Sequence, residues 1–456
     1  MLRRVDVSEA GGHPRDRLDR QLGPFDAAML VVASVIGAGI FFTPGQVAAL
    51  VPSPFWILVA WSIGGLLSLA GALANAELGA MYPHAGGDYV YLREAFHPVA
   101  GFLVGWISFF AIYAGTIAAL ALAFAEGVGE RFALDASGVL TIAVAVTLAA
   151  SALNYVGVTW GARANNLTSA LKIAALAAFV LVGPFMGVGD AARLVEDPPV
   201  GAAGFDLTNL GRALSPILFT YLGWNASVYV ASEIRSPGRN VPRSLFLGLG
   251  ICGVVYLAVN AIYLYVLPMD VLMGSPNAGE AAGLALFGEL GGTLVGSFVL
   301  LSVVGTLNAT VLVGPRIAYA MALDGLFFRG VDRVHASFRT PSVAILVQAG
   351  IAVALLLLLR NFPSALDFTV FAILLATSAD VLALYRLRAK APMRHRPYRA
   401  WGYPWVPGVY LASNAAIATA MLIGSPFECA VSVCLLLAGL PFYWIWRAND
   451  RSDAPT

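Results

Sequence analysis

Charged residues are scarce in this chain, because Asp, Glu, Lys and Arg make up only 12% of its 456 residues. Soluble domains carry about a quarter. Residues 27 to 76 contain no charged residue at all, and the mean hydropathy of the whole chain is +0.79. This scarcity excludes an ordinary soluble domain and predicts an integral membrane protein with many spans.

Cysteines and catalytic motifs are also nearly absent. The three cysteines lie in apolar runs with no partner at metal-ligand spacing, so neither a disulfide framework nor a metal site is expected. No H-E-x-x-H, P-loop or G-x-S-x-G motif occurs, and the five histidines fall in tails or loops. No basic stripe with interleaved aromatic residues suggests nucleic-acid binding. We therefore expect no enzyme, no cofactor and no primary pump.

Long apolar runs are what the chain does contain. A membrane-spanning helix needs about 20 such residues, and the run from 27 to 76 is therefore two spans joined by a turn at 51 to 54. The same reasoning along the chain predicts an all-α protein of twelve transmembrane helices. These are 27–50, 55–76, 98–125, 136–157, 166–187, 213–232, 244–267, 290–315, 341–359, 363–385, 404–424 and 427–446.

The positions of the basic residues predict the orientation. If the N-terminus is cytoplasmic, inner segments hold 22 of the 27 Lys and Arg and outer loops hold four, as the positive-inside rule requires. No signal peptide is visible, since residues 1 to 23 are polar and include five arginines. We expect a multi-pass protein of the inner (plasma) membrane with both termini in the cytoplasm.

Two spans are interrupted at matching places. Gly37 and Gly39 stand in the middle of the first span, and the sequence TYLGWN occupies 220 to 225 in the sixth. Glycines at these places are equally typical of close helix packing. The sixth span follows the first by five, so spans 1–5 and 6–10 would be inverted halves. Broken helices in such halves indicate a transport site near the middle of the membrane. Ser34 could add a hydroxyl there or bond back to its own helix.

The sixth span is rich in aromatic and polar residues around its interruption. An aromatic belt at the membrane surface is one interpretation. However, the cluster lies well inside the span, which favours the wall of a cavity. Its members are Phe219, Thr220, Tyr221, Leu222, Gly223, Trp224 and Asn225.

Lys172 is a lysine inside the fifth span, where a charge must be paired, neutral or able to reach the surface. It could extend its flexible stem to the inner surface, or lie near the site as an amine that exchanges a proton or takes the place of a metal ion. Three charged residues end spans at the predicted inner side: Glu77, Glu233 and Arg316. They could be solvated or paired there, or they could form a cytoplasmic gate of ion pairs. We assign no role to Asp367 and Asp380, and we expect no acid in the pocket.

Six segments carry a resemblance to a known family. The chain resembles the amino acid–polyamine–organocation superfamily of secondary transporters, nearest to bacterial amino acid permeases and L-type amino acid transporters, from Gly23 to about residue 445. The six segments are SVIGAGIFFTPG (34–45), AELGAMYPHAGGDYVYLREAF (76–96), NYVGVTWGARANNLTSALK (154–172), FTYLGWNASVYVASEI (219–234), RNVPRSL (239–245) and NATVLVGPRIAYAMALDGLF (308–327).

The resemblance implies the leucine-transporter fold with a 5+5 inverted repeat. The expected divisions are a tail (1–23), a first repeat (24–187), an outer loop (188–212), a second repeat (213–388), helices 11 and 12 (389–447) and a C-terminal tail (448–456). Backbone groups of Ile36, Gly37, Ala38, Gly39 and Ile40 would bind the substrate, with Phe219 as a gate and Thr220 to Leu222 as the helix 6 break. Lys172 matches the lysine that occupies the position of a sodium ion in sodium-independent members.

Three functions follow from these features. The first is sodium-independent transport of a neutral α-amino acid by alternating access, coupled to protons or to exchange, and Leu222 should narrow the pocket against bulky aromatic substrates. The second is transport of a cationic amino acid or polyamine, which would need a carboxylate or an aromatic box such as Trp224 and Tyr221 could provide. The third is a channel or a membrane-embedded enzyme, but neither a filter of repeated groups nor a catalytic set is present.

Overall fold

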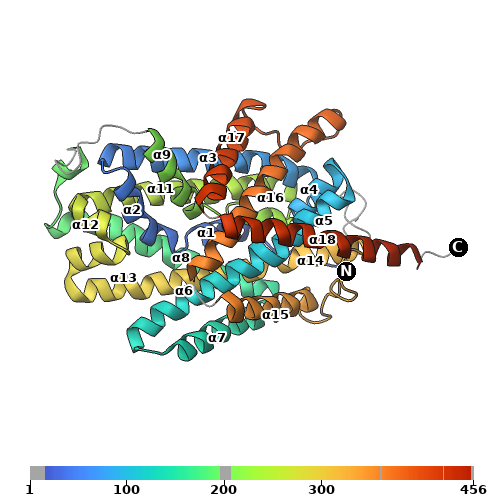
Figure 1. Cartoon of the computed structure of the whole chain (residues 1–456), viewed down its shortest axis with the longest axis horizontal. Coiled ribbons are helices and arrows are strands. Elements are labelled where there is room, and N and C mark those ends of the chain that lie inside the picture. The colour runs from blue at the N-terminus through green and yellow to red at the C-terminus, as the bar shows by residue number, and fades with distance from the viewer. Residues whose placement is uncertain (1–15, 196–206, 360–361, 425, 453–456) are drawn as a thin grey trace, which may run out of the picture.

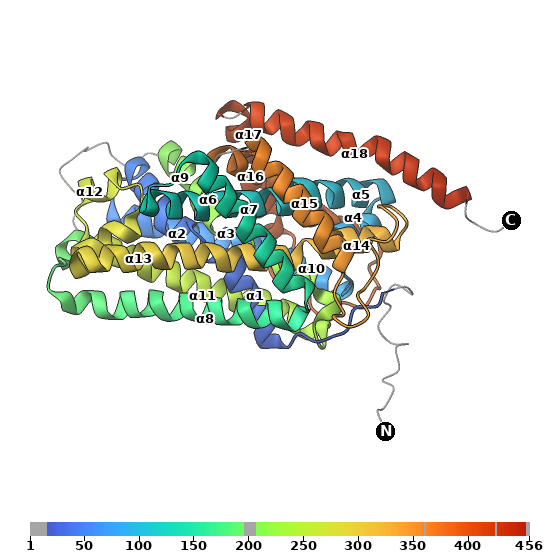
Figure 2. The same ribbon diagram turned by 90° about the horizontal axis from the view of Figure 1, so that it is seen from below.

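The structure is a computed structural model that describes residues 16–195, 207–359, 362–424 and 426–452. These residues form a bundle of helices, and the longest helices run along one common axis (Figures 1 and 2). The described residues contain no strand beyond one isolated bridge between Leu22 and Ile234. The all-α fold class predicted from the sequence is confirmed.

The first five spans begin with a broken helix. Helices α1 and α2 pass the length and hydropathy test for one span only together, and they bend by 45° at the break between them. The third span is interrupted by a π-helical turn, η2. The elements are α1 (Pro24–Val35), α2 (Gly39–Leu50), α3 (Pro54–Met81), α4 (Asp88–Ala95), α5 (Pro98–Ile107), η2 (Ser108–Tyr113), α6 (Ala114–Phe132), α7 (Ala136–Tyr155) and α8 (Val158–Val182).

The remaining spans begin with a second broken helix, formed by α9 and α10. Two short helices, α12 and α14, flank the long α13. The elements are α9 (Leu207–Thr220), α10 (Ala226–Tyr229), α11 (Pro237–Val266), α12 (Met269–Gly274), α13 (Ala278–Val313), α14 (Pro315–Leu323), α15 (Ser342–Leu359), α16 (Phe362–Lys390), α17 (Trp405–Gly424) and α18 (Pro426–Ser452).

The twelve predicted spans can all be located among these helices. Nine described helices are long and apolar enough to cross a membrane alone, and the α1–α2 pair makes ten. The other two are the shorter apolar helix α15 and the interrupted α9–α10 segment. Element order and the two broken helices are those of the leucine-transporter fold.

Several predicted boundaries were wrong by up to eight residues. Helix α8 begins at Val158 rather than 166, because a helix can continue past the apolar core into its polar flank at Arg163. Helix α9 begins at Leu207 rather than 213. Helix α13 begins at Ala278, but a kink at Gly288 (φ 69°) separates this first part from the predicted span at 290–315.

The domain boundaries stay a prediction. Residues 1–15 of the predicted N-terminal tail, 196–206 of the loop and 453–456 of the C-terminal tail lie outside the described residues.

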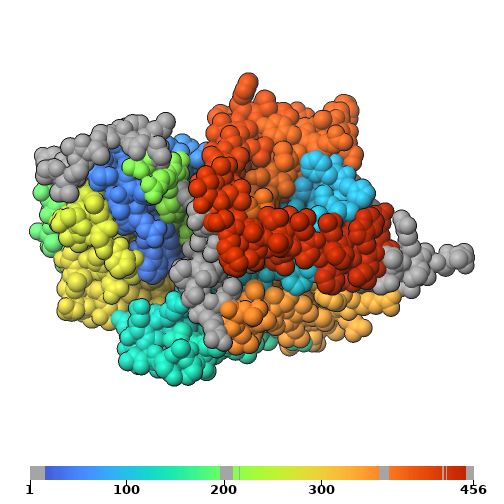
Figure 3. Space-filling model, viewed as in Figure 1, coloured from blue at the N-terminus to red at the C-terminus, as the bar shows by residue number. Residues whose placement is uncertain are grey.

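Helix α1 lies in the middle of the bundle, where it packs against α8, α11 and α13. Its central position suits its composition, since apolar residues surround it and nearly all of them are buried. Helices α17 and α18 instead lie on the outside (Figure 3) and expose apolar side chains such as Phe427 and Trp444. The peripheral position of α17 and α18 agrees with their expected role as additions to two five-helix halves.

Candidate functional site

The two broken helices cross each other at their interruptions. Gly39 lies against Thr220 of α9, and a Cβ atom at Gly39 would be 2.7 Å from the Thr220 hydroxyl. Gly223 (φ +94°) lies against Ser34 of α1, and a Cβ atom there would be 2.7 Å from the Ser34 carbonyl oxygen. Each break therefore needs a glycine because the other helix fills the space that a side chain would occupy.

Hydrogen bonds join the two breaks. The single proton of the Tyr256 hydroxyl is shared between the carbonyl oxygens of Val35 (2.8 Å) and Thr220 (3.1 Å), which belong to different broken helices. The hydroxyls of Thr43 and Thr220 lie 3.0 Å apart. The crossing is thus held at a defined geometry by groups from α1, α2, α9 and α11.

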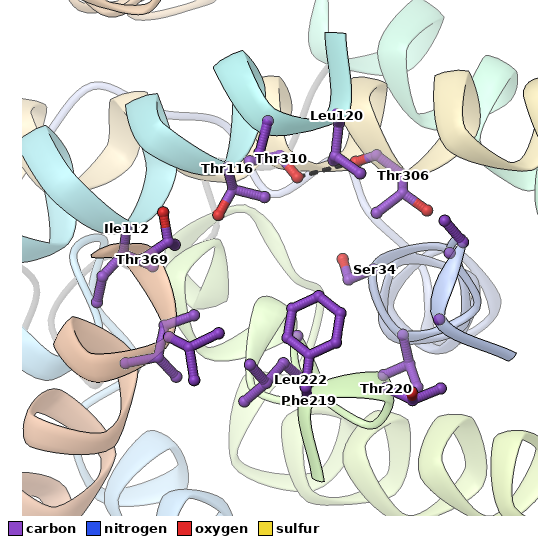
Figure 4. Close-up of a pocket in the computed structure, with 18 of the residues that line it drawn as sticks. Ser34, Ile112, Thr116, Leu120, Phe219, Thr220, Leu222, Thr306, Thr310 and Thr369 are labelled. Carbon is purple, nitrogen blue, oxygen red and sulfur yellow. Dashed lines mark hydrogen bonds between the residues drawn. The ribbon is translucent and has the colours of Figure 1, made fainter. Parts of the chain in front are cut away.

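A cavity of about 600 Å³ opens beside this crossing. Figure 4 shows the Phe219 ring next to Ser34, with Thr306 and Thr310 of α13 on the opposite wall. Most of the residues predicted for the site line the cavity: Ser34, Gly37, Ala38, Gly39, Phe219, Thr220, Leu222 and Asn225.

Three predicted site residues turn their side chains elsewhere. The side chains of Ile36 and Ile40 are buried outside the cavity lining, so only their backbone groups are available to a ligand. The Tyr221 side chain packs between Trp61 and Tyr256 and supports the break from behind. Helix α9 ends at Thr220 and α10 starts at Ala226, so the break covers 221–225, further along than the expected Thr220 to Leu222.

The rest of the cavity wall comes from helices whose role the sequence did not reveal. Isolated threonines in otherwise apolar spans were the available signal, since a hydroxyl facing a cavity costs less than one facing lipid. Many such threonines also bond to their own helix, as Thr310 does to the Thr306 carbonyl oxygen at 2.9 Å. The additional wall residues include Ile112, Thr116, Leu120, Thr306, Thr310 and Thr369 (Figure 4).

Lys172 reaches the first break and does not extend to the surface. Its side chain is fully buried, and Nζ donates to the carbonyl oxygens of Ile36 (2.5 Å) and Ala33 (3.3 Å) and to the Thr306 hydroxyl (2.9 Å). The Lys172 amine thus supplies donors to carbonyl groups that the end of α1 leaves without helical partners.

Ser34 bonds back to its own helix and also lines the cavity. Its hydroxyl donates to the Leu30 carbonyl oxygen at 2.8 Å, which is the bond back to its own helix. The residue nevertheless lines the cavity, and the hydroxyl oxygen remains available as an acceptor.

One expectation about the site was wrong, because an acid does line the cavity. Asp88, the first residue of α4, borders its deep end beside Tyr229. Asp88 follows a turn with two glycines of positive φ, Gly86 and Gly87, and this turn brings the start of α4 inward. Such folding back of a chain segment cannot be inferred from hydropathy.

One end of the cavity is open and the other is sealed. Its lining extends to Leu50 and Arg212, at the end of the bundle where α2 and α9 lie side by side (Figure 3). At the opposite end, Arg316 forms a two-pronged ion pair with Glu233 (2.7 and 3.0 Å), and both side chains are only 1% exposed. Glu77 likewise binds Arg388 and Arg396. These residues are paired across helices, as in the gate interpretation.

Comparison with known proteins agrees with this arrangement. Residues 22–441 match the family described as "Amino acid permease". The chain is 31% identical to the serine/threonine exchanger SteT of Bacillus subtilis (strain 168), over 96% of this chain and 100% of that protein. It is 28% identical to the human Asc-type amino acid transporter 1 (97% and 85% covered) and to the human large neutral amino acids transporter small subunit 2 (95% and 82%). The chain therefore belongs to the amino acid permease family, as an all-helical membrane transporter of amino acids.

Proposed function

We propose that this permease is a sodium-independent transporter of a small neutral α-amino acid that works by alternating access. The observation that carries the proposal is the cavity at the crossing of the two breaks, with Lys172 bound to the carbonyl groups of the first. Membership of the family indicates amino acid transport in general. The geometry of the site supports a small neutral substrate and independence from sodium.

The two breaks offer partners for both charged groups of an amino acid. The first N–H groups of α2, at Gly39 and Ile40, have no acceptor inside their helix. They lie at the N-terminus of α2, which is the positive end of the helix dipole. A carboxylate would accept from them. The C-terminal end of α1 presents carbonyl oxygens with the opposite polarity, and the substrate ammonium group would donate to these.

The remaining cavity wall favours a small, uncharged side chain. Hydroxyl groups of Ser34, Thr116 and Thr310 border it, while Phe219 and Leu222 restrict its width. Asp88, the one acid among the described lining residues, is only 1% exposed, so a cationic substrate would have to reach an almost fully buried carboxyl group. Serine, threonine and alanine are the first candidates.

Lys172 supports independence from sodium. A sodium ion prefers oxygen ligands such as carbonyl groups, and here the Lys172 amine occupies those of Ala33 and Ile36.

Exchange in proteoliposomes tests substrate and ion together. Vesicles loaded with one amino acid should take up labelled serine, threonine or alanine at equal rates in sodium and in potassium buffers. Lysine and putrescine in tenfold excess should not compete. Uptake that needs sodium, or that lysine or putrescine inhibits as well as serine does, would contradict the proposal.

Lys172→Met keeps the apolar stem and removes the ammonium group. Among the described residues, the carbonyl oxygens of Ala33 and Ile36 then keep only the hydroxyl donors of Thr306 and Ser302. Each hydrogen bond lost typically costs about 0.5–1.5 kcal/mol, and the first break loosens. We expect exchange to fall at least tenfold and the melting temperature of the purified protein to drop. Lys390→Met is the matched control, because Lys390 is exposed and its amine donates to the Glu94 carbonyl oxygen rather than to a break. Equal exchange in the two variants would remove Lys172 from the mechanism.

The direction in which the cavity opens completes the proposal. With the N-terminus in the cytoplasm, the open end at Leu50 and Arg212 faces outward, and the sealed end at Glu233 and Arg316 faces inward. The structure would then be the outward-facing state, and transport would require the inner ion pairs to separate.

A further inference from the structure

Two buried carboxyl groups meet at the deep end of the cavity. Asp88 of α4 is 1% exposed and Asp380 of α16 is fully buried. Helix α16 packs directly on α4 and brings the two carboxyl groups together. Asp88 Oδ1 and both oxygens of Asp380 are buried and have no other hydrogen-bond partner among the described residues. Two ionised carboxylates in contact and out of water repel strongly, so such pairs normally share a proton.

The partners of the two acids differ. Asp88 accepts a hydrogen bond from the Tyr229 hydroxyl and lies at the N-terminus of α4, where the helix dipole favours a negative charge. Neither oxygen of Asp380 has a donor among the described residues, and the buried side-chain amide of Asn75 also has no hydrogen-bond partner there. If Asp380 is protonated, it donates to Asp88, and both groups are satisfied.

The other groups that face the pair are uncharged. Among the described residues of α3, α5, α6, α14, α17 and α18, no Lys, Arg or His interacts electrostatically with either carboxyl. Burial raises the pKa of the Asp88 carboxyl to about 6, and its hydrogen bonds with Asp380 and Tyr229 oppose that rise. The facing titratable groups are phenols, which are neutral near pH 7: Tyr91, Tyr113, Tyr229 and Tyr410.

A chain of polar contacts connects the pair to the second break. The Asn225 amide donates to the Tyr229 hydroxyl at 3.2 Å, and that hydroxyl donates to Asp88. Asn225, Tyr229 and Asp88 all line the cavity, so water and substrate in the cavity are close to the proton.

We propose that Asp88 and Asp380 form a proton-binding pair, in which Asp380 carries one proton and donates it to Asp88, and that this proton leaves when the sealed end of the cavity opens. Tyr229 and Asn225 connect its occupancy to the helix 6 break. The link to transport rests on the proposed function, whereas the proton site itself does not.

Melting temperatures of the purified protein without amino acid test the site. The native pair holds a proton that the unfolded chain, with carboxyl pKa values near 3.9, releases above about pH 5. The wild-type melting temperature should therefore fall as the pH rises from about 5 to about 8. Asp380→Asn should be less dependent on pH, because the Asn amide donates to Asp88 at every pH.

Asp270→Asn is the matched control, since it removes an exposed carboxyl of α12 and should keep the wild-type slope. If Asp380→Asn does not fold, Asp88→Asn replaces it, because its amide equally joins the pair without a shared proton. Equal slopes in the pair variant and in Asp270→Asn would overturn the proton site.

The pH profile of amino acid exchange in proteoliposomes tests the link to transport. A single ionisation changes the exchange rate by up to about tenfold per pH unit. Wild type and Asp270→Asn should therefore show a pH-dependent exchange rate, and Asp380→Asn should show a flat pH profile. The same pH dependence of exchange in all three proteins would overturn the link between the proton site and transport. If wild type exchanged no amino acid at any pH, the proposed function would fail, and the melting series would still decide whether the pair binds a proton.

Discussion

At the scale of single residues, Gly39 has the least room for a side chain at the crossing of the two breaks. A Cβ atom there would approach three atoms of Thr220 at 2.7–3.0 Å. Thr220 cannot turn away easily, because its hydroxyl bonds to the Pro216 carbonyl oxygen at 2.9 Å and its side chain is short and buried. Gly37, two residues earlier, has only ordinary contacts, the nearest at 3.4 Å from Thr306.

Gly39→Ala should push the two breaks apart, whereas Gly37→Ala should be tolerated. Overpacking of a rigid contact costs about 1–3 kcal/mol. Since 1.4 kcal/mol is about tenfold in affinity, we expect substrate binding to weaken about tenfold or more in Gly39→Ala. Ligand-induced thermal shift of the two variants and wild type measures this. Comparable binding in both variants would show that the glycines serve only helix packing.

The sequence predicted the glycines but not which of them was critical. Both lower the local helix propensity in the same way, so propensity cannot distinguish them. Only the neighbour across the crossing does, and Thr220 is supplied by a different helix. The same holds for Lys172, whose burial could be predicted and whose three acceptors could not.

At the scale of elements, the Arg316–Glu233 pair joins the start of α14 to the short 3-10 turn η5 (Ala231–Glu233), which follows α10. Arg316 also donates to the Leu312 carbonyl oxygen at 2.6 Å. The backbone of Leu22 pairs with Glu233 and Arg235, so the segment before α1 lies against this end. Separation of these elements would open the cavity at its sealed end.

Arg316→Met should destabilise the sealed end. It leaves Glu233 as an uncompensated buried charge, which typically costs about 3–5 kcal/mol. We expect a lower melting temperature and faster proteolysis of the segment before α1. Adding Glu233→Leu should restore much of the loss, because the unpaired charge is then gone.

The exposed pair of Arg339 with Asp19, at 3.5 Å, provides the control. Both side chains are about half exposed, so Asp19→Asn should change stability by less than about 1 kcal/mol. A similar effect of Arg316→Met and Asp19→Asn would contradict the role of the buried pair.

At the scale of the whole molecule, the two ends of the bundle differ in their content of basic residues. Helices α4 and α14 and the C-terminal end of α18 lie at one end, and α12 lies at the other (Figures 1 and 2). Basic residues gather at the first end, and the charge bias predicts that this end is cytoplasmic.

Cysteine labelling in right-side-out vesicles tests this orientation. In a Cys434→Ser background, which removes the exposed native thiol, an impermeant maleimide should label Pro276→Cys and not Met393→Cys. Both positions are exposed, with Met393 at 93%. Permeabilisation should make the second variant reactive. The reverse pattern would invert the topology.

The sequence by itself determined the class of protein, the number of spans, their expected orientation and the two interrupted helices. These properties are local, since hydropathy, charge and the cost of glycine act within one segment of chain. Only the tertiary structure decided which groups meet: Thr43 with Thr220, 177 positions apart, Lys172 with the first break, and Asp88 with Asp380. Contacts of this kind depend on how helices cross and where a turn folds inward, and no periodicity in the chain encodes them. An acid outside the predicted spans could therefore belong to the floor of the cavity, and an aspartate with no assigned role could become half of a proton site.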